Sequence, residues 1–173
     1  MLVKKNKIGI LGGSFDPAHK GHLAISKEAI KRLKLDQMIW AITKKNPFKK
    51  KSKVSLLNRI KYCKKIIGKN DFIKIKFYED IVKSNKTINL IRYITKNKKN
   101  QIYFLMGADS LINFHRWHKW EEIIEKCKIV VFDRYGYKQK SLNSITFKRL
   151  NEGSLKFIKF NKVNISSSQL RKI

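Results

Sequence analysis

Residues 8–22 constrain the fold of this chain more than any other stretch. The apolar run 8–11 is typical of a short buried strand. Gly12 and Gly13 follow it, and two glycines allow a tight turn and a close approach of backbone to a ligand. His19 and His22 come next, and on a helix this spacing places both rings on one face. A strand, a glycine turn and a helix N-terminus predict an anion site, because free N–H groups and the positive end of the helix dipole coincide there.

The residues around the two histidines carry a more specific signal than the glycines do. The run SFDP at residues 14–17 precedes the run HKGH at residues 19–22. Together they resemble the (H/T)xGH signature of the nucleotidyltransferases with a dinucleotide-fold core. Those enzymes transfer a nucleotidyl group from a nucleoside triphosphate, and this run is closest in form to their adenylyltransferase branch.

Apolar runs of strand length alternate with helical patterns along the chain. A helix over residues 21–35 and a strand over residues 38–42 complete a β-α-β unit. The same patterns predict helices over residues 56–67, 87–95 (beginning at Ser84 or Asn85) and 111–125, and strands over residues 72–77, 102–106, 129–132 and 155–160. We therefore expect an α/β fold in one domain, residues 1–173, with a Rossmann-like doubly wound parallel sheet of the nucleotidyltransferase type. Its ligands should lie beyond the carboxyl ends of the strands.

The chain is strongly basic, with 41 lysines and arginines against 12 acidic residues and a formal net charge of +29. Such an excess is one mark of a nucleic-acid partner. Here, however, the lysines are scattered along the whole chain, greatly outnumber the arginines and accompany many Ile and Asn residues. Drift in an AT-rich genome explains this better, so we expect no specific nucleic acid partner. The charge would still attract an anionic substrate such as ATP.

We expect the protein to be cytoplasmic. No apolar run is long enough to span a bilayer, and no apolar segment of a signal peptide precedes the first strand, so we expect no membrane association. Cys63 and Cys127 stand far apart and unaccompanied. That pattern favours reduced thiols in the core over a disulfide framework or a metal site.

Two further segments fall at predicted strand ends. Residues 107–123 read GADSLINFHRWHKWEEI, which resembles the GxDSLxxFxxWxxxxxI segment of the bacterial nicotinate-nucleotide adenylyltransferases. Residues 165–171 read ISSSQLR, which is similar to the ISSTxIR motif of the wider superfamily. The three segments occur in the family's order and span essentially the whole chain. The aromatic segment is the one that singles out the nicotinate branch.

The resemblance implies that ATP and nicotinate mononucleotide react to give nicotinate adenine dinucleotide (deamido-NAD) and pyrophosphate, a step of NAD biosynthesis. In the family the 5′-phosphate of the mononucleotide attacks the α-phosphorus of ATP directly, so the protein supplies positioning and charge stabilisation. Mg²⁺ would be carried by the triphosphate. The implied site residues are His19 and His22 at the ATP phosphates; Gly12, Gly13, Ser14, Phe15, Gly107, Asp109, Ser167, Ser168 and Arg171 for ATP; and Thr87 and Trp117 for the nicotinate nucleotide.

Simpler interpretations stand beside these roles. His19 and His22 are alternatively a helix cap and a surface residue, or metal ligands together with Asp16. For the other residues the structural alternatives are a helix cap for Asp109, a core position for Trp120, and the rim of the site for His115 and His118.

Rival functions are also open at this point. A pantetheine-phosphate adenylyltransferase shares the His-x-Gly-His and Ile-Ser-Ser-Ser themes, and a related enzyme prefers nicotinamide mononucleotide. A basic, non-catalytic nucleic-acid-binding protein belongs to a different class. The chain also departs from the family pattern, because residues 46–49 read NPFK where many members have Pro-Pro-His-(Lys/Arg). A homo-oligomer is compatible with all of these.

Overall fold

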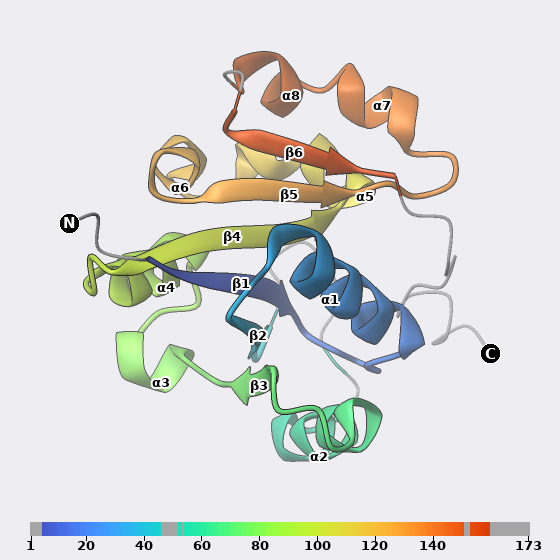
Figure 1. Ribbon diagram of the computed structural model, residues 1–173, viewed down its shortest axis with the longest axis vertical. Helices are drawn as coiled ribbons and strands as arrows, with labels where there is room; N and C mark the ends of the chain where they lie inside the picture. Colours follow the sequence, from blue (N-terminus) through green and yellow to red (C-terminus); the bar gives the residue numbers. More distant parts are fainter. Residues whose placement is uncertain (1–4, 46–51, 53, 151–152, 160–173) are drawn as a thin grey trace.

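A single parallel sheet organises the part of the chain that the structure describes. This computed structural model describes residues 5–45, 52, 54–150 and 153–159. The sheet has the order β3-β2-β1-β4-β5-β6 (Figure 1). Its strands are β1 (Asn6–Gly13), β2 (Gln37–Ile42), β3 (Ile73–Lys76), β4 (Asn100–Gly107), β5 (Lys128–Phe132) and β6 (Leu155–Ile158). This order confirms the expected Rossmann-like fold, and it reverses direction between β1 and β4, where ligands bind in such sheets.

Helices cover both faces of the sheet. Figure 1 shows α1 (Lys20–Leu33) in front of β1 and β4, on the side opposite to α4 (Thr87–Thr95). Two buried apolar clusters reflect these two layers, one around Trp40 and Leu105 and the other around Ile88 and Phe104. Because both faces are covered, the central strands are continuous apolar runs. The remaining helices are α2 (Leu56–Ile67), α3 (Glu79–Val82), α5 (Ala108–Ile112), η1 (Phe114–Arg116), α6 (Trp120–Lys126), α7 (Lys138–Leu142) and α8 (Ile145–Arg149).

Helix α2 follows the sequence prediction closely. Ser55 is its N-cap, and the Ser55 side chain accepts a hydrogen bond from the backbone N–H of Asn58. At the other end Gly68 has a φ of 61°, in the region that favours glycine, and its N–H donates to the Lys64 carbonyl. Cap residues therefore mark both ends of this helix, as the sequence predicts.

The prediction of one helix over residues 111–125 is wrong. The segment is divided into α5, η1 and α6. Trp117 is extended (φ −76°, ψ 143°), and Lys119 is left-handed with a φ of 52°. These two residues break the i to i−4 hydrogen-bond ladder, since neither has helical backbone angles. The break leaves Trp117 between η1 and α6, with its ring against Phe104 of the central strand β4.

The predicted start of the helix at Ser84 or Asn85 is also wrong. Its N-cap is Lys86, and the Ser84 hydroxyl instead accepts the Lys86 backbone N–H at 3.1 Å, in a turn that precedes the helix. The short helices α3, α7 and α8 were not predicted. Each has four or five residues, too few for a clear periodic pattern.

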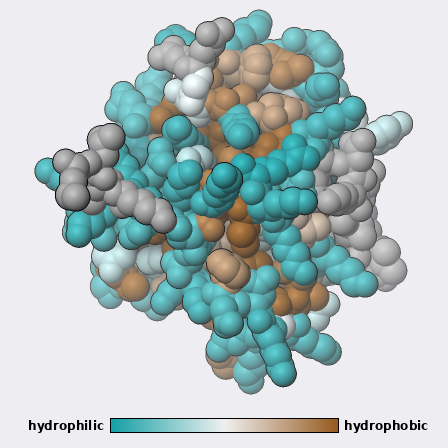
Figure 2. Space-filling view, viewed as in Figure 1, coloured by the Kyte–Doolittle hydropathy of each residue, from teal (hydrophilic) through white to brown (hydrophobic). Residues whose placement is uncertain are grey.

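Hydrophilic residues lie mainly on the surface and the two cysteines lie in the core, as the sequence predicts. Hydrophilic residues cover most of the face in Figure 2, with hydrophobic residues showing between them. Within the described residues, no helix has the length and apolar character needed to cross a bilayer. Cys63 and Cys127 are buried and free, as expected of core thiols. Burial raises the pKa of each thiol to about 12.

Candidate active site

The two histidines of the HKGH run form the start of helix α1. His19 is the N-cap, and its Nδ1 accepts the backbone N–H of Gly21 at 3.1 Å. The Nδ1 of His22 accepts the backbone N–H of His19, also at 3.1 Å. The two ring centroids are 3.8 Å apart. This is a capping box in which imidazoles replace the usual hydroxyl and carboxylate, so the cap alternative for His19 is correct as far as local structure goes.

The hydrogen bonds to the two Nδ1 atoms fix the tautomer of each ring. An imidazole nitrogen that accepts a backbone N–H carries no proton of its own. In the neutral ring the proton is then on Nε2, the other nitrogen. His19 and His22 therefore present two Nε2–H donors at the positive end of a helix of 14 residues. Such a pair is suited to binding and stabilising negatively charged phosphate oxygens.

Buried aromatic side chains pack against the His22 ring. The Phe15 ring stacks on Trp40 with a centroid distance of 5.0 Å and lies 4.9 Å from the His22 ring. The Trp40 indole donates to the Ser26 hydroxyl, which in turn donates to the His22 carbonyl, both at 2.8 Å. Phe15 is 2% exposed, so its side chain belongs to the core and does not line a cavity.

The glycine pair does not form the tight turn that the sequence predicted. Gly12 and Gly13 are the last residues of strand β1. The left-handed residue of the turn is instead Phe15, with a φ of 48°. A non-glycine residue in this conformation is uncommon, and here the stacking on Trp40 holds it. The glycines instead leave the strand end without side chains where it borders a cavity.

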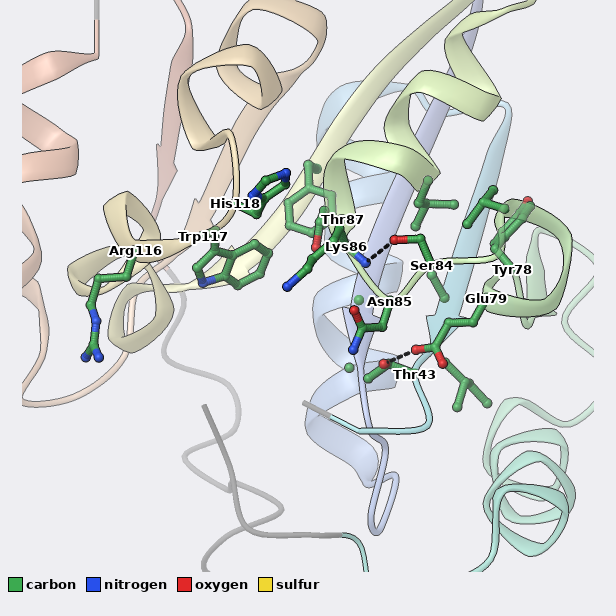
Figure 3. A pocket seen from close by; sticks show the side chains of 17 residues that line it. Thr43, Tyr78, Glu79, Ser84, Asn85, Lys86, Thr87, Arg116, Trp117 and His118 are labelled. Carbon is green, nitrogen blue, oxygen red and sulfur yellow. Dashed lines mark hydrogen bonds between the residues drawn. The ribbon is translucent and has the colours of Figure 1, made fainter. Parts of the chain in front are cut away.

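A cavity of about 390 Å³ opens at the ends of β1 and β2 and beside Phe104 of β4 (Figure 3). Gly12 and Gly13 line it together with Thr87, Trp117 and Phe104. The Trp117 ring packs edge-on against the Phe104 ring at 5.9 Å and points toward the start of α4, where Thr87 lies. The cavity is further lined by Ala41, Ile42, Thr43, Tyr78, Glu79, Val82, Ser84, Asn85, Lys86, Leu90, Arg116 and His118. The structure thus brings together glycine-loop and aromatic-segment residues from distant parts of the chain.

A carboxylate in this cavity is already engaged. Glu79 on α3 accepts hydrogen bonds from the Thr43 hydroxyl, drawn in Figure 3, and from the Lys44 backbone N–H. Lys44 also pairs with Asp80 at 3.1 Å. These contacts tie the segment after β2 to α3. Glu79 is therefore a structural acceptor at the cavity wall.

Asp109 pairs with an arginine of the next strand connection. Its carboxylate accepts a hydrogen bond from Arg134 at 2.9 Å, and both side chains are partly exposed. The N-cap of α5 is Gly107, and Asp109 stands in the first turn. The alternative that Asp109 caps this helix is therefore wrong. Trp120 packs edge-on against Phe114 at a centroid distance of 6.2 Å, as expected for a core-facing residue.

Arg59 is a residue that sequence reasoning missed. It is 3% exposed, on the buried stripe of α2 with Cys63 and Ile67. Its guanidinium donates to the carbonyl of Ser14, after β1, and to that of Thr43, after β2. An arginine four residues before a buried cysteine on one helix face was the available signal, since arginine is seldom buried without partners.

Several predicted positions lie outside the described residues. They are Ser167, Ser168 and Arg171, together with the NPFK segment at 46–49. Among the residues that are described, no group of three or more His, Cys, Asp and Glu side chains could hold a metal ion. His118 lines the cavity, and the backbone N–H of His115 donates to the Thr146 hydroxyl.

The strand order of the parallel sheet reverses between β1 and β4, and a cavity lies at the end of β1, which is the arrangement of the Rossmann-like class of nucleotide-binding proteins. The cytidylyltransferase-like family matches residues 10–173. The chain is 68% identical over 170 residues to a protein of Pelagibacter ubique (strain HTCC1062) named a nicotinate-nucleotide adenylyltransferase, covering 98% of this chain and 94% of that one. A protein of Agrobacterium fabrum (strain C58) with the same name is 39% identical over 139 residues, 79% of this chain and 74% of that one.

Solved structures show the same fold. Nicotinic acid mononucleotide adenylyltransferase of Plasmodium falciparum, complexed with NaAD, matches with a TM-score of 0.77 at 20% identity, over 96% of this chain and 83% of that one. The chain therefore belongs to the cytidylyltransferase-like nucleotidyltransferases and, within them, to the nicotinate-nucleotide adenylyltransferase family.

Proposed function

We propose that this protein transfers the adenylyl group of ATP to nicotinate mononucleotide, giving nicotinate adenine dinucleotide and pyrophosphate, in NAD biosynthesis. The observation that carries the proposal is that Gly12, Gly13, Thr87 and Trp117 line one and the same cavity. Two nucleotides must meet in one place for this reaction. The cavity adjoins the strand reversal, and the two histidines cap the helix that directly follows β1.

His19 and His22 act on the phosphates in this proposal. A phosphate oxygen of the mononucleotide bonds to the α-phosphorus of ATP as the bond to the pyrophosphate oxygen breaks. Negative charge then develops on the leaving pyrophosphate and on the α-phosphate oxygens. The two Nε2–H donors would stabilise this charge without any rearrangement, since their rings are already held by the backbone. No covalent intermediate with the protein is required.

The nicotinate end would bind between Trp117 and the start of α4. The Lys86 N-cap makes no side-chain cap hydrogen bond, so the first N–H groups of this nine-residue helix are not capped by it. A helix N-terminus favours a negative group, and the nicotinate ring carries a carboxylate. Thr87 would lie at that carboxylate, while the Trp117 indole, held by Phe104 and Phe114, would pack against the ring.

The ATP end would extend along β4. Gly107 and Asp109 would border the ribose or adenine, with backbone at Gly12, Gly13 and Ser14 on the other side. Ser167, Ser168 and Arg171 would hold the β and γ phosphates. Mg²⁺ would arrive with the triphosphate, because this ion keeps its waters and binds phosphate oxygens readily. Asp16 is 1% exposed and Asp109 is paired with Arg134, so neither is offered as a free ligand.

The experiment is a measurement of pyrophosphate release with ATP and Mg²⁺, offering three acceptors in parallel. We expect turnover with nicotinate mononucleotide to exceed that with nicotinamide mononucleotide and with phosphopantetheine. Preference for either of the other acceptors would overturn the substrate while leaving the histidine chemistry intact. No turnover with any acceptor, together with salt-dependent binding to any duplex, would favour the nucleic-acid alternative.

We further propose that the enzyme works in the cytoplasm as one domain.

A further inference from the structure

Arg59 is a buried cation that the proposed reaction does not use directly. Its guanidinium donates to four backbone carbonyls, those of Ser14, Thr43 (2.9 Å), Lys44 (3.3 Å) and Val54 (3.2 Å). All four acceptors are neutral. Burial lowers the pKa of Arg59, and the nearby Asp16 carboxylate opposes that effect. A cation is costly to bury, so its position calls for an explanation beyond filling space.

The four carbonyls come from two separate connections, one between β1 and α1 and the other between β2 and α2. Ser14 lies between β1 and the histidines, Thr43 and Lys44 follow β2, and Val54 precedes α2. A guanidinium has five N–H groups in a fixed planar fork, so one side chain can hold several carbonyls at set angles. A lysine ammonium is a single point and cannot reproduce that arrangement. Arg59 therefore fixes the ends of two neighbouring strands relative to each other.

The contact with Ser14 bears directly on the phosphate-binding turn. In a planar trans peptide, holding the Ser14 carbonyl also fixes the Phe15 N–H, which points the opposite way. Phe15 then supports His22 through its ring. Thr43 is tied in addition to Gly13 by a backbone hydrogen bond of 3.0 Å. A displacement at Arg59 would thus reach both the glycine end of β1 and the histidine rings.

We propose that Arg59 is a positioning residue for adenylyl transfer, which holds the turn after β1 in the geometry that the two histidines need. It touches no substrate in this role and acts through Ser14 and Thr43. The inference rests on the proposed function. It assigns a catalytic consequence to a side chain that otherwise looks purely structural.

The test compares Arg59→Ala and Arg59→Lys with the wild type and with Arg32→Ala. Arg32 serves as the matched control because its side chain, which pairs with Glu28 on α1, is 48% exposed. We expect kcat of Arg59→Ala to fall about 100-fold, as small misplacements of reacting groups do, while ATP affinity measured by calorimetry changes about tenfold or less. Millimolar guanidinium should restore much of the rate, whereas ammonium at equal ionic strength should not.

The outcomes separate this inference from the proposed function. Wild-type turnover with nicotinate mononucleotide tests the function, and the variants are then assayed with whichever acceptor the wild type uses. Arg59→Lys keeps the charge and loses the fork, so it covers the case in which Arg59→Ala fails to fold. A folded Arg59→Lys with activity within about twofold of the wild type would overturn the positioning role. So would a folded Arg59→Ala that guanidinium does not rescue.

Discussion

The His19 and His22 rings lie 3.8 Å apart, and each is held by a backbone N–H on its Nδ1. The same two bonds satisfy N–H groups that are otherwise unpaired at the start of a helix. Helix initiation and the orientation of the two imidazoles are therefore one structural feature. Any substitution at these positions changes the local stability of α1 and the phosphate site together, unless it is chosen to separate them.

His19→Asn separates the two roles of His19. Asparagine is a good N-cap, because its side-chain oxygen can accept the Gly21 N–H, but it has no donor where Nε2 lies. We expect His19→Asn to keep its unfolding free energy within about 0.5 kcal/mol of the wild type, whereas His19→Ala loses about 1 kcal/mol. Both should lose most of their turnover. Urea unfolding and pyrophosphate release measure the two effects, and an active His19→Asn would refute the phosphate role.

His22→Ala should lower kcat much more than it raises the Michaelis constant for ATP. The contact of His22 should strengthen as charge develops on the phosphates, so its loss acts mainly on the transition state. We expect a fall in kcat of about 100-fold or more, the usual effect of removing one such donor. Lys31→Ala, in the last turn of the same helix, serves as the control. A change confined to the Michaelis constant would contradict this role.

Trp117→Ala should weaken binding of the nicotinate nucleotide selectively. The indole supplies a large flat surface at the cavity wall, so its removal should raise the Michaelis constant for the mononucleotide about tenfold. The constant for ATP should change little. Trp120→Phe is the matched control, since Trp120 packs against Phe114 and does not line the cavity. Equal effects on both substrates would argue against a nicotinate site at Trp117.

The Asp109–Arg134 pair should behave as a coupled unit. If Arg134 orients the Asp109 carboxylate for ATP, then Asp109→Asn and Arg134→Ala should each weaken ATP binding, and the double variant should lose less than the sum. The coupling energy should be about 0.5–1 kcal/mol, because both side chains are partly exposed. Calorimetric titration of ATP into the four proteins measures it. Strict additivity would mean that the two side chains act independently.

The buried thiols predict a pH dependence of stability. Burial raises the pKa of Cys63 and Cys127 to about 12 in the folded protein, while thiols of an unfolded chain ionise near pH 8.5. The unfolded state therefore releases thiol protons first as the pH rises, so this contribution to stability is complete below pH 8.5 and declines from there to about pH 12. A Cys63→Ala/Cys127→Ala variant should lack this part of the decline. At pH 8 the native thiols should react slowly with a disulfide reagent, and fast labelling without denaturant would contradict their burial.

Much of the fold could be predicted because its signals are local. Apolar runs predicted the strands, and Ser55 and Gly68 are the cap residues at the two ends of α2. The failures also have physical causes. A continuous helix was expected over residues 111–125 from their composition, but the left-handed backbone at Lys119 interrupts it. Similarly, two adjacent glycines predict a turn, whereas the left-handed residue is Phe15, whose ring stacks on the distant Trp40.

By itself, the sequence determined the class of fold, the two histidines and the pairing of a glycine segment with an aromatic segment. These follow from local patterns, namely period, spacing and cap residues. Only the tertiary structure decided that Thr87 and Trp117 border the same cavity as Gly12, that Asp109 is paired with Arg134, and that Arg59 holds two connections together. Such contacts join residues far apart in the chain, and their geometry depends on how the packed layers bring strand ends together.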